Sequence, residues 1–193
     1  MALVDAAIEL IAERGVRDFS LAEVSRRLGV TVAAPYRHFT DRDDLLAAVG
    51  VRALHTFAAA LAAETDGAQA PEQRLAAMAR AYVRFASEQR PLFDTVFGTG
   101  LDKSRYPELQ RAWRPLDETV DSCVAEICPG DPAAAQALAA AAEATAHGYA
   151  MLLLDGSYGQ GEDAVSAASG QAARAVLALI QGRTALQQPD PGN

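Results

Sequence analysis

The chain has 193 residues, of which half are hydrophobic and only 6% are aromatic, and its formal net charge is −8. This length suits one compact domain or two small ones that share a core, and abundant alanine beside few aromatics favours packed helices over sheets. The negative charge excludes a polycation that binds nucleic acid through bulk electrostatics, although it leaves a local basic patch open.

The first thirty residues predict two helices. Apolar side chains recur at helical spacing over residues 2–14, and Gly15 follows the last of them. Ser20 is a good N-cap for a second, short helix, which Gly29 closes in the manner of a C-cap glycine. Two short helices joined by a turn with glycine are typical of the helix-turn-helix, whose second helix enters the major groove of DNA.

The second helix of that pair is expected to start at Thr31 and to run into Phe39. Pro35 falls at its fourth position, where it removes a hydrogen bond and restricts Ala34, so we expect an irregular or tightened first turn and regular helix from about Pro35. Pro35 either only fixes the start of a short helix or shapes how the backbone meets DNA. Between residues 20 and 40 the sequence has three arginines against one glutamate, a basic balance opposite to that of the whole chain.

Helical periodicity continues through the rest of the chain, interrupted by turn residues. Further helices are expected over residues 40–64, 72–88, about 90–97, 107–128, 132–154 and 162–181. Pro115 is expected to kink or split the helix that contains it, and Asp131 to cap the following one. The total is about nine helices with no convincing strand, which predicts an all-α fold.

Gly15, the block LAEVSRRLGV, the ending PYRHF and the following DRDDLL resemble the N-terminal domain of TetR-family transcriptional regulators. The segment AHGYAMLLLDG, residues 146–156, is similar to the C-terminal helix of one TetR subgroup, without the tryptophan expected before its His-Gly pair. The resemblance implies a TetR-like fold with a three-helix DNA-binding domain at residues 1–48, a ligand-binding and dimerisation domain at 49–183 and a disordered tail at 184–193. Many relatives carry a basic arm before the first helix; here either that minor-groove contact is absent or the N-terminus is trimmed.

The resemblance also implies which side chains meet DNA. The predicted DNA-binding residues are Thr31, Val32, Ala33, Tyr36, Arg37, His38 and Arg42. Val32 and Ala33 correspond to residues that face base edges, and the others to contacts with the phosphate backbone. Residues 32–34 include no Arg, Asn, Gln or Glu, so bidentate hydrogen bonds to guanine or adenine are excluded there. We therefore expect sequence specificity to come from contacts with thymine methyl groups and from DNA shape. Two of these residues have alternative interpretations: Tyr36 as a core aromatic and Arg42 as a solvated surface arginine.

Large side chains in the second half are candidates for binding a small apolar or aromatic effector, because clefts between helices are common ligand sites. The predicted ligand-binding residues are Tyr82, Phe85, Phe93, Phe97, Trp113, His147 and Met151. Aromatics at helical spacing equally fill a core. Gly148 follows His147 inside a helix, where glycine costs about 1 kcal/mol relative to alanine, so we expect close helix packing or room for a ligand. His147 is then either a polar anchor or a hydrogen-bonded core histidine.

The last two helices are rich in alanine, which lets helices approach closely. The family resemblance implies a four-helix interface between two copies, unless these helices only cover their own core. The predicted dimerisation residues are Leu152, Leu153, Val176, Leu177 and Ile180. Two recognition helices tied together in this way address two half-sites.

Other classes of protein have little support in the sequence. Cys123 and Cys128 are five residues apart, which indicates neither a metal site nor a disulfide scaffold, and no cofactor is predicted. The chain has three histidines and no recognisable catalytic constellation, so we do not predict an enzyme. No signal peptide is present, and the charge-free runs beside Glu143 are too short to cross a bilayer, so we expect a cytoplasmic protein that does not bind membranes.

We therefore predict a homodimeric DNA-binding transcriptional regulator, a ligand-responsive repressor that binds a palindromic double-stranded operator. Repression rather than activation is carried over from the family. The alternative is a helical small-molecule-binding or adaptor protein whose helix-turn-helix mediates protein contacts, which the acidic net charge favours. An all-α enzyme is the third possibility.

Overall fold

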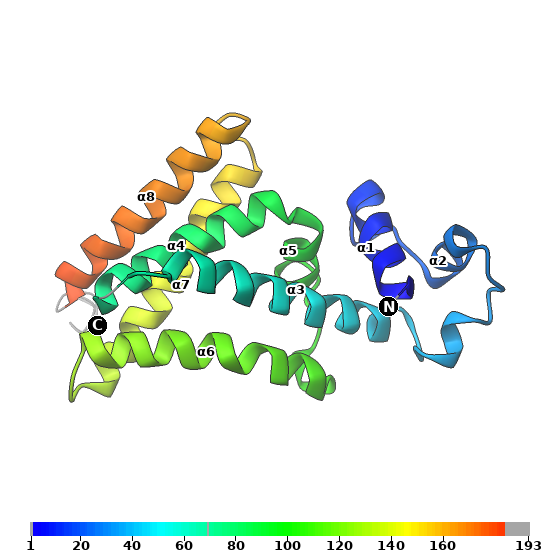
Figure 1. The fold of residues 1–193 in the computed structure, drawn as a ribbon, viewed down its shortest axis with the longest axis horizontal. Coiled ribbons are helices and arrows are strands. Elements are labelled where there is room, and N and C mark those ends of the chain that lie inside the picture. Colours follow the sequence, from blue (N-terminus) through cyan, green and yellow to red (C-terminus); the bar gives the residue numbers. More distant parts are fainter. Residues whose placement is uncertain (1, 69, 184–193) are drawn as a thin grey trace, which may run out of the picture. The chain divides into compact units, whose positions relative to one another are not determined.

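A computed structural model describes residues 2–68 and 70–183 of the chain. Within these residues the fold is entirely helical and no strand is present (Figure 1). The α-helices are α1 (Ala2–Arg14), α2 (Leu21–Leu28), α3 (Arg42–Thr65), α4 (Pro71–Glu88), α5 (Arg90–Phe97), α6 (Pro107–Ile127), α7 (Pro132–Leu154) and α8 (Glu162–Gln181), and the short 3-10 segments are η1 (Pro35–Arg37) and η2 (Lys103–Arg105). The predicted all-α fold is confirmed, and about nine helices is close to this set. The predicted disordered tail, residues 184–193, lies outside the described residues.

The chain forms two compact units. Unit 1 contains the chain up to Thr56 together with Gln89–Arg114, and unit 2 contains Phe57–Glu88 and the chain from Pro115 onward. The helices α3 and α6 therefore each contribute residues to both units. The predicted boundary after residue 48 divides the chain by function rather than by packing, and it stays a prediction.

The first two helices form as their end signals predict. The Ser20 hydroxyl accepts a hydrogen bond from the Glu23 backbone N–H at 3.4 Å. At the other end of α2, Gly29 adopts a left-handed conformation with φ of 65°, and the Val30 N–H donates to the Ser25 carbonyl at 3.0 Å. Glycine adopts this conformation without the steric cost that a Cβ brings, which explains why α2 ends there. The helices α1 and α2 pack against each other in unit 1.

The segment after α2 differs from the expected recognition helix. The Ala34 N–H donates to the Thr31 carbonyl at 2.9 Å, so the first turn is tightened as predicted. Regular α-helix from Pro35 onward is wrong, because only the three-residue η1 forms, closed by a 2.9 Å bond from the His38 N–H to the Pro35 carbonyl. Pro35 has no N–H to donate to an earlier carbonyl, and its ring is buried, so it anchors the segment by packing instead.

The helix α6 passes through Pro115 without interruption, so the predicted split after Arg114 is wrong, and the alternative, a kink at Pro115, stays a prediction. Proline removes one intrahelical hydrogen bond but does not end a helix whose neighbouring turns are held by packing. Here Ala112 and Leu116 are buried on either side of the proline, which is itself exposed. The predicted cap of α7 is confirmed, since the Asp131 carboxylate accepts the Ala134 N–H at 2.9 Å.

Unit 2 is built on α4, α7 and α8, each of which packs against the other two (Figure 1). Alanines form much of the contact, and those buried on α7 and α8 include Ala142, Ala146, Ala168 and Ala172. Small side chains let the helix backbones approach closely.

Two helices, α3 and α7, are long and apolar enough to cross a membrane by length and composition. The sequence-based expectation that no segment could cross a bilayer considered only runs without a charged residue. The apolar stretch of α3 contains one charged residue, Arg52, and was therefore not included. Half of the apolar window of α3 is buried inside the fold, and much of the hydropathy of α7 comes from alanine. We interpret both as packing helices of the two units.

Candidate nucleic-acid interface and effector cavity

Most of the predicted DNA-binding residues lie on one exposed segment between α2 and α3. Val32 and Tyr36 are each 56% exposed, which excludes the alternative that Tyr36 is a core aromatic. The predicted DNA-binding residues that are exposed in this segment are Thr31, Val32, Ala33, Tyr36, Arg37 and His38. Pro35 is buried between them, and a tight turn from Thr31 followed by the short η1 presents these residues where a longer helix was expected.

The chemistry of this segment suits a phosphate backbone and apolar base edges. Thr31 and Tyr36 offer hydroxyl donors, and His38 offers a ring N–H. Within the described part of the chain Arg37 makes no ion pair, so its guanidinium is available to an anion. Val32 and Ala33 can contact only apolar groups, such as the thymine methyl in the major groove.

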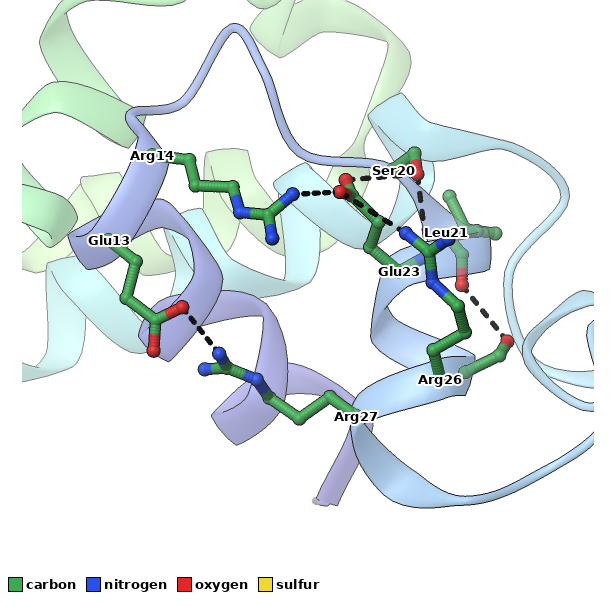
Figure 2. Close-up of polar contacts among 8 residues, drawn as sticks. Glu13, Arg14, Ser20, Leu21, Glu23, Arg26 and Arg27 are labelled. Carbon is green, nitrogen blue, oxygen red and sulfur yellow. Dashed lines mark hydrogen bonds and ion pairs between the residues drawn. The ribbon is translucent and has the colours of Figure 1, made fainter.

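Arg14, Arg26 and Arg27, on the two helices before this segment, form ion pairs inside the domain (Figure 2). Arg27 of α2 pairs with Glu13 of α1, and Glu23 of α2 pairs with both Arg14 of α1 and Arg26 of α2. Arg27 also pairs with Glu9 of α1. The hydrogen bond from Arg27 lowers the pKa of the Glu13 carboxyl. The pairs of Arg14 and Arg27 hold α1 against α2, and together the ion pairs reduce the local positive charge that the sequence indicates.

Arg42 has a role that neither sequence alternative foresaw. Its Nε donates to the Phe19 carbonyl at 3.2 Å, and its Nη2 donates to the Val16 carbonyl. The guanidinium also lies 4.9 Å from the centroid of the Phe19 ring and 3.4 Å from the Asp43 carboxylate. Arg42 therefore fixes the connection between α1 and α2 to the start of α3. No sequence signal marks these contacts, because two of the partners are backbone carbonyls.

The predicted ligand-binding residues divide between the two units. In unit 2 the Tyr82 hydroxyl lies 2.9 Å from His147 Nδ1, and Phe57 packs against both Tyr82 and Phe85. Burial, with a smaller effect of the Glu143 carboxylate, raises the pKa of Tyr82, so its phenol stays protonated. In unit 1, Phe97 contacts both Phe93 and Trp113. Met151 belongs to neither group and is 47% exposed.

A cavity of about 190 Å³ lies in unit 2 between α3, α4 and α6. Its lining is mostly apolar and includes Ala58, Leu61, Met78, Pro115 and Leu116. The hydroxyls of the lining residues Thr65 and Thr119 donate to carbonyls of their own helices. A wider groove shares four of its lining residues and carries the polar side chains of Arg74, Glu118, Ser122 and Glu126. None of the predicted ligand-binding residues lines either space, because aromatic residues at helical spacing fill the core here.

The polar rim of this groove is held by contacts within unit 2. Arg74 on α4 and Glu126 on α6 form an ion pair at 2.6 Å. The Cys123 thiol donates to the Pro71 carbonyl at 2.9 Å, and burial raises the pKa of that thiol. A thiol with a raised pKa is a poor nucleophile, so Cys123 is a packing residue of the groove wall.

The predicted dimerisation residues lie on two different faces. Leu153, Val176 and Ile180 are buried within the chain, whereas Leu152 is 45% and Leu177 37% exposed. Successive residues of a helix point in different directions, and here Leu152 points outward while Leu153 is buried. Met151 joins the exposed leucines on the accessible faces of α7 and α8.

Comparison with protein families finds two matches along this chain. A model described as bacterial regulatory proteins of the tetR family matches residues 3–49, and one described as the tetracyclin repressor-like C-terminal domain matches residues 75–175. The HTH-type transcriptional regulator BetI of Brucella suis biovar 1 is 34% identical over 76 residues, which are 39% of this chain and 38% of that protein. The chain thus matches well under half the length of this relative.

Solved structures with the same fold extend over almost the whole chain. A protein with unknown function from Rhodococcus sp. RHA1 is 30% identical with a TM-score of 0.71, covering 90% of this chain and 93% of that one. The TetR-family regulator PfmR from Thermus thermophilus is 21% identical with a TM-score of 0.62, covering 92% and 96%. FadR from Bacillus subtilis, in complex with stearoyl-CoA, is 16% identical with a TM-score of 0.70, covering 93% and 96%.

Proposed function

Because this chain belongs to the TetR family of bacterial regulatory proteins, we propose that it is a ligand-responsive transcriptional repressor that binds a palindromic operator as a homodimer. The observation that carries the proposal is the exposed segment from Thr31 to His38, called the recognition segment below. It places hydrogen-bond donors for phosphate beside the apolar side chains of Val32 and Ala33. A cytoplasmic location follows from this role. The family match, rather than any missing catalytic residue, favours a regulator over an enzyme.

Within the recognition segment, we assign contacts with phosphates and contacts with bases to different residues. Tyr36, Arg37 and His38 set the register by contacting phosphates, which carries no sequence information. Val32 and Ala33 discriminate by apolar contact with thymine methyl groups. Arg42 supports the domain from within rather than serving mainly as a phosphate contact, since its donors are used by Val16 and Phe19.

Substituting Tyr36 tests the DNA-binding proposal directly. Tyr36→Ala is expected to weaken binding about 10- to 100-fold on every duplex, because a hydrogen bond to a charged phosphate contributes about 1.5–3 kcal/mol. The duplex is one selected from a random pool by the native protein, and the measurement is fluorescence anisotropy at fixed salt. Tyr36→Phe separates loss of the hydroxyl from loss of the ring, and Arg90→Gln, in an exposed ion pair with Asp94, is the control. Unchanged affinity of Tyr36→Ala would count against the proposed interface.

The apolar cavity of unit 2 is the proposed effector site. Ala58, Leu61, Met78 and Leu116 offer only apolar contact, so the ligand's buried part is hydrocarbon or aromatic. At about 190 Å³ the cavity is smaller than most ligand sites, and a larger ligand would extend into the polar groove beside Arg74 and Glu126. The stearoyl-CoA bound by the FadR of similar fold also combines an apolar chain with a polar group. The effector acts by binding more tightly to a dimer state whose recognition segments no longer fit both half-sites.

Filling this cavity tests the site without knowledge of the natural effector. Ala58→Phe is expected to weaken binding of the apolar fluorophore N-phenyl-1-naphthylamine about tenfold, which corresponds to about 1.4 kcal/mol. Ala59→Phe, one residue along α3 and outside the lining, is expected to bind the dye as the native chain does. Equal affinities of the two variants, measured by fluorescence titration, would place the dye elsewhere and remove the support for this cavity.

A further inference from the structure

A second, chemically different cavity lies in unit 1, where the structure and the comparisons assign no ligand. It measures about 500 Å³ and lies within a single compact unit. One wall is formed by the start of the α1–α2 connection and the start of α3, and the other by the segment from Gly98 to Tyr106. This volume is within the range of sites for small organic molecules.

Three arginines from separate parts of the sequence line this cavity. Arg17 follows α1, Arg42 begins α3, and Arg105 ends η2. Arg42 is occupied by the Val16 and Phe19 carbonyls. Within residues 2–68 and 70–183, Arg17 and Arg105 form no ion pair, and both are exposed. Two unpaired guanidinium groups at one cavity are a notable feature in a chain whose net charge is −8.

The two carboxylates that line the cavity are engaged locally. Asp43 lies 3.4 Å from Arg42. Asp102 accepts hydrogen bonds from the Ser104 N–H at 3.0 Å and the Ser104 hydroxyl at 2.6 Å, and these bonds lower the pKa of Asp102. Arg105 acts on Asp102 only through a smaller charge effect, so the guanidinium donors of Arg17 and Arg105 remain available to an anion. Guanidinium groups bind carboxylates and phosphates bidentately, which suits them to a small anion.

We propose that this cavity binds a small organic anion, a phosphate monoester or a carboxylate, between Arg17 and Arg105. The site is distinct from the apolar effector cavity, which lies in the other unit and offers hydrocarbon contact. Its ligand class differs accordingly. The proposal does not depend on DNA binding, because the whole site is formed by residues of unit 1 and needs no duplex.

Thermal unfolding of the full chain tests the site with named probes. Inorganic phosphate, glycerol 3-phosphate and citrate are titrated at constant ionic strength against sodium chloride. A ligand at ten times its dissociation constant is expected to raise the Tm by about 3 to 6 °C, and the rise is expected to increase with the logarithm of the ligand concentration. At least one of the three probes should produce it.

The variants Arg17→Gln and Arg105→Gln are expected to abolish this rise, while Arg111→Gln, an exposed arginine of unit 1 outside the cavity, keeps it. If a substitution itself changes the Tm, isothermal titration calorimetry on the same variants measures the dissociation constant of the probe directly. A rise that chloride reproduces, or that survives in both variants, would overturn the proposal. A response to duplex DNA alone, lost in both variants, would also overturn it and would assign the two arginines to the DNA backbone.

Discussion

The double variant Leu152→Glu with Leu177→Glu is expected to be monomeric and to lose about 100-fold or more in affinity for a selected duplex. Both leucines are exposed on the accessible faces of α7 and α8, where the proposed partner subunit would cover them. A carboxylate buried there without a partner disfavours association strongly. Because two recognition segments tied together act with a high effective concentration, a monomer that contacts one half-site binds the duplex far more weakly than the dimer.

The loss must come from the interface and not from unfolding. Neither leucine is buried in its own chain, so the variant is expected to keep its helical circular dichroism and cooperative unfolding. Ala125→Glu introduces the same charge at an exposed position of α6 and serves as the matched control. Light scattering after size exclusion gives the mass, and anisotropy gives the affinity. A dimeric double variant, or a monomer that binds DNA as tightly as the native chain, contradicts the proposed interface.

The variant Arg42→Met is expected to lower the free energy of unfolding by about 2–4 kcal/mol. Its guanidinium donates to two backbone carbonyls, and hydrogen bonds to charged groups contribute about 1.5–3 kcal/mol each without adding fully. Its stacking over the Phe19 ring is lost as well. Urea unfolding followed by the fluorescence of Trp113, the single tryptophan of the chain, reports on unit 1, which contains both residues.

The variant Arg42→Lys distinguishes a structural role of Arg42 from a role as a phosphate contact. Arg42→Lys keeps the charge but lacks the planar set of donors, so we expect it to recover little of the lost stability. Arg90→Met, which removes an exposed arginine of unit 1, should change the unfolding free energy by less than about 0.5 kcal/mol. Native stability in Arg42→Met, combined with weakened DNA binding, would return Arg42 to the role of a phosphate contact.

Helix boundaries were predictable because their signals are local. Ser20, Gly29 and Asp131 each act on backbone groups within a few residues, and the structure forms the predicted cap at all three. The recognition segment was less predictable, because the burial of Pro35 depends on tertiary packing. The same reason explains α6, which continues through Pro115 since buried neighbours hold both adjacent turns.

Functional contacts between distant residues were the least predictable. Arg42 reaches carbonyls 23 and 26 residues earlier in the chain, and no side-chain pattern encodes a carbonyl partner. Aromatic content indicated a ligand site, but Tyr82 and Phe85 pack in the core of unit 2 while the cavity is lined by small and aliphatic side chains. On α8, Val176 and Ile180 were predicted as dimerisation residues because of their size. Their position on the helix instead directs both side chains into the core of the same chain.

The measurement that tests the central claim most directly is binding of the native chain to its selected duplex across a salt series, with the stoichiometry determined at saturation. The account predicts two chains per duplex and a log–log slope of affinity against salt of about −2 or steeper, since Arg37 of each copy displaces at least one counterion. A chain that stays monomeric and binds no duplex at about 50 mM salt, where backbone contacts are strong, would contradict it.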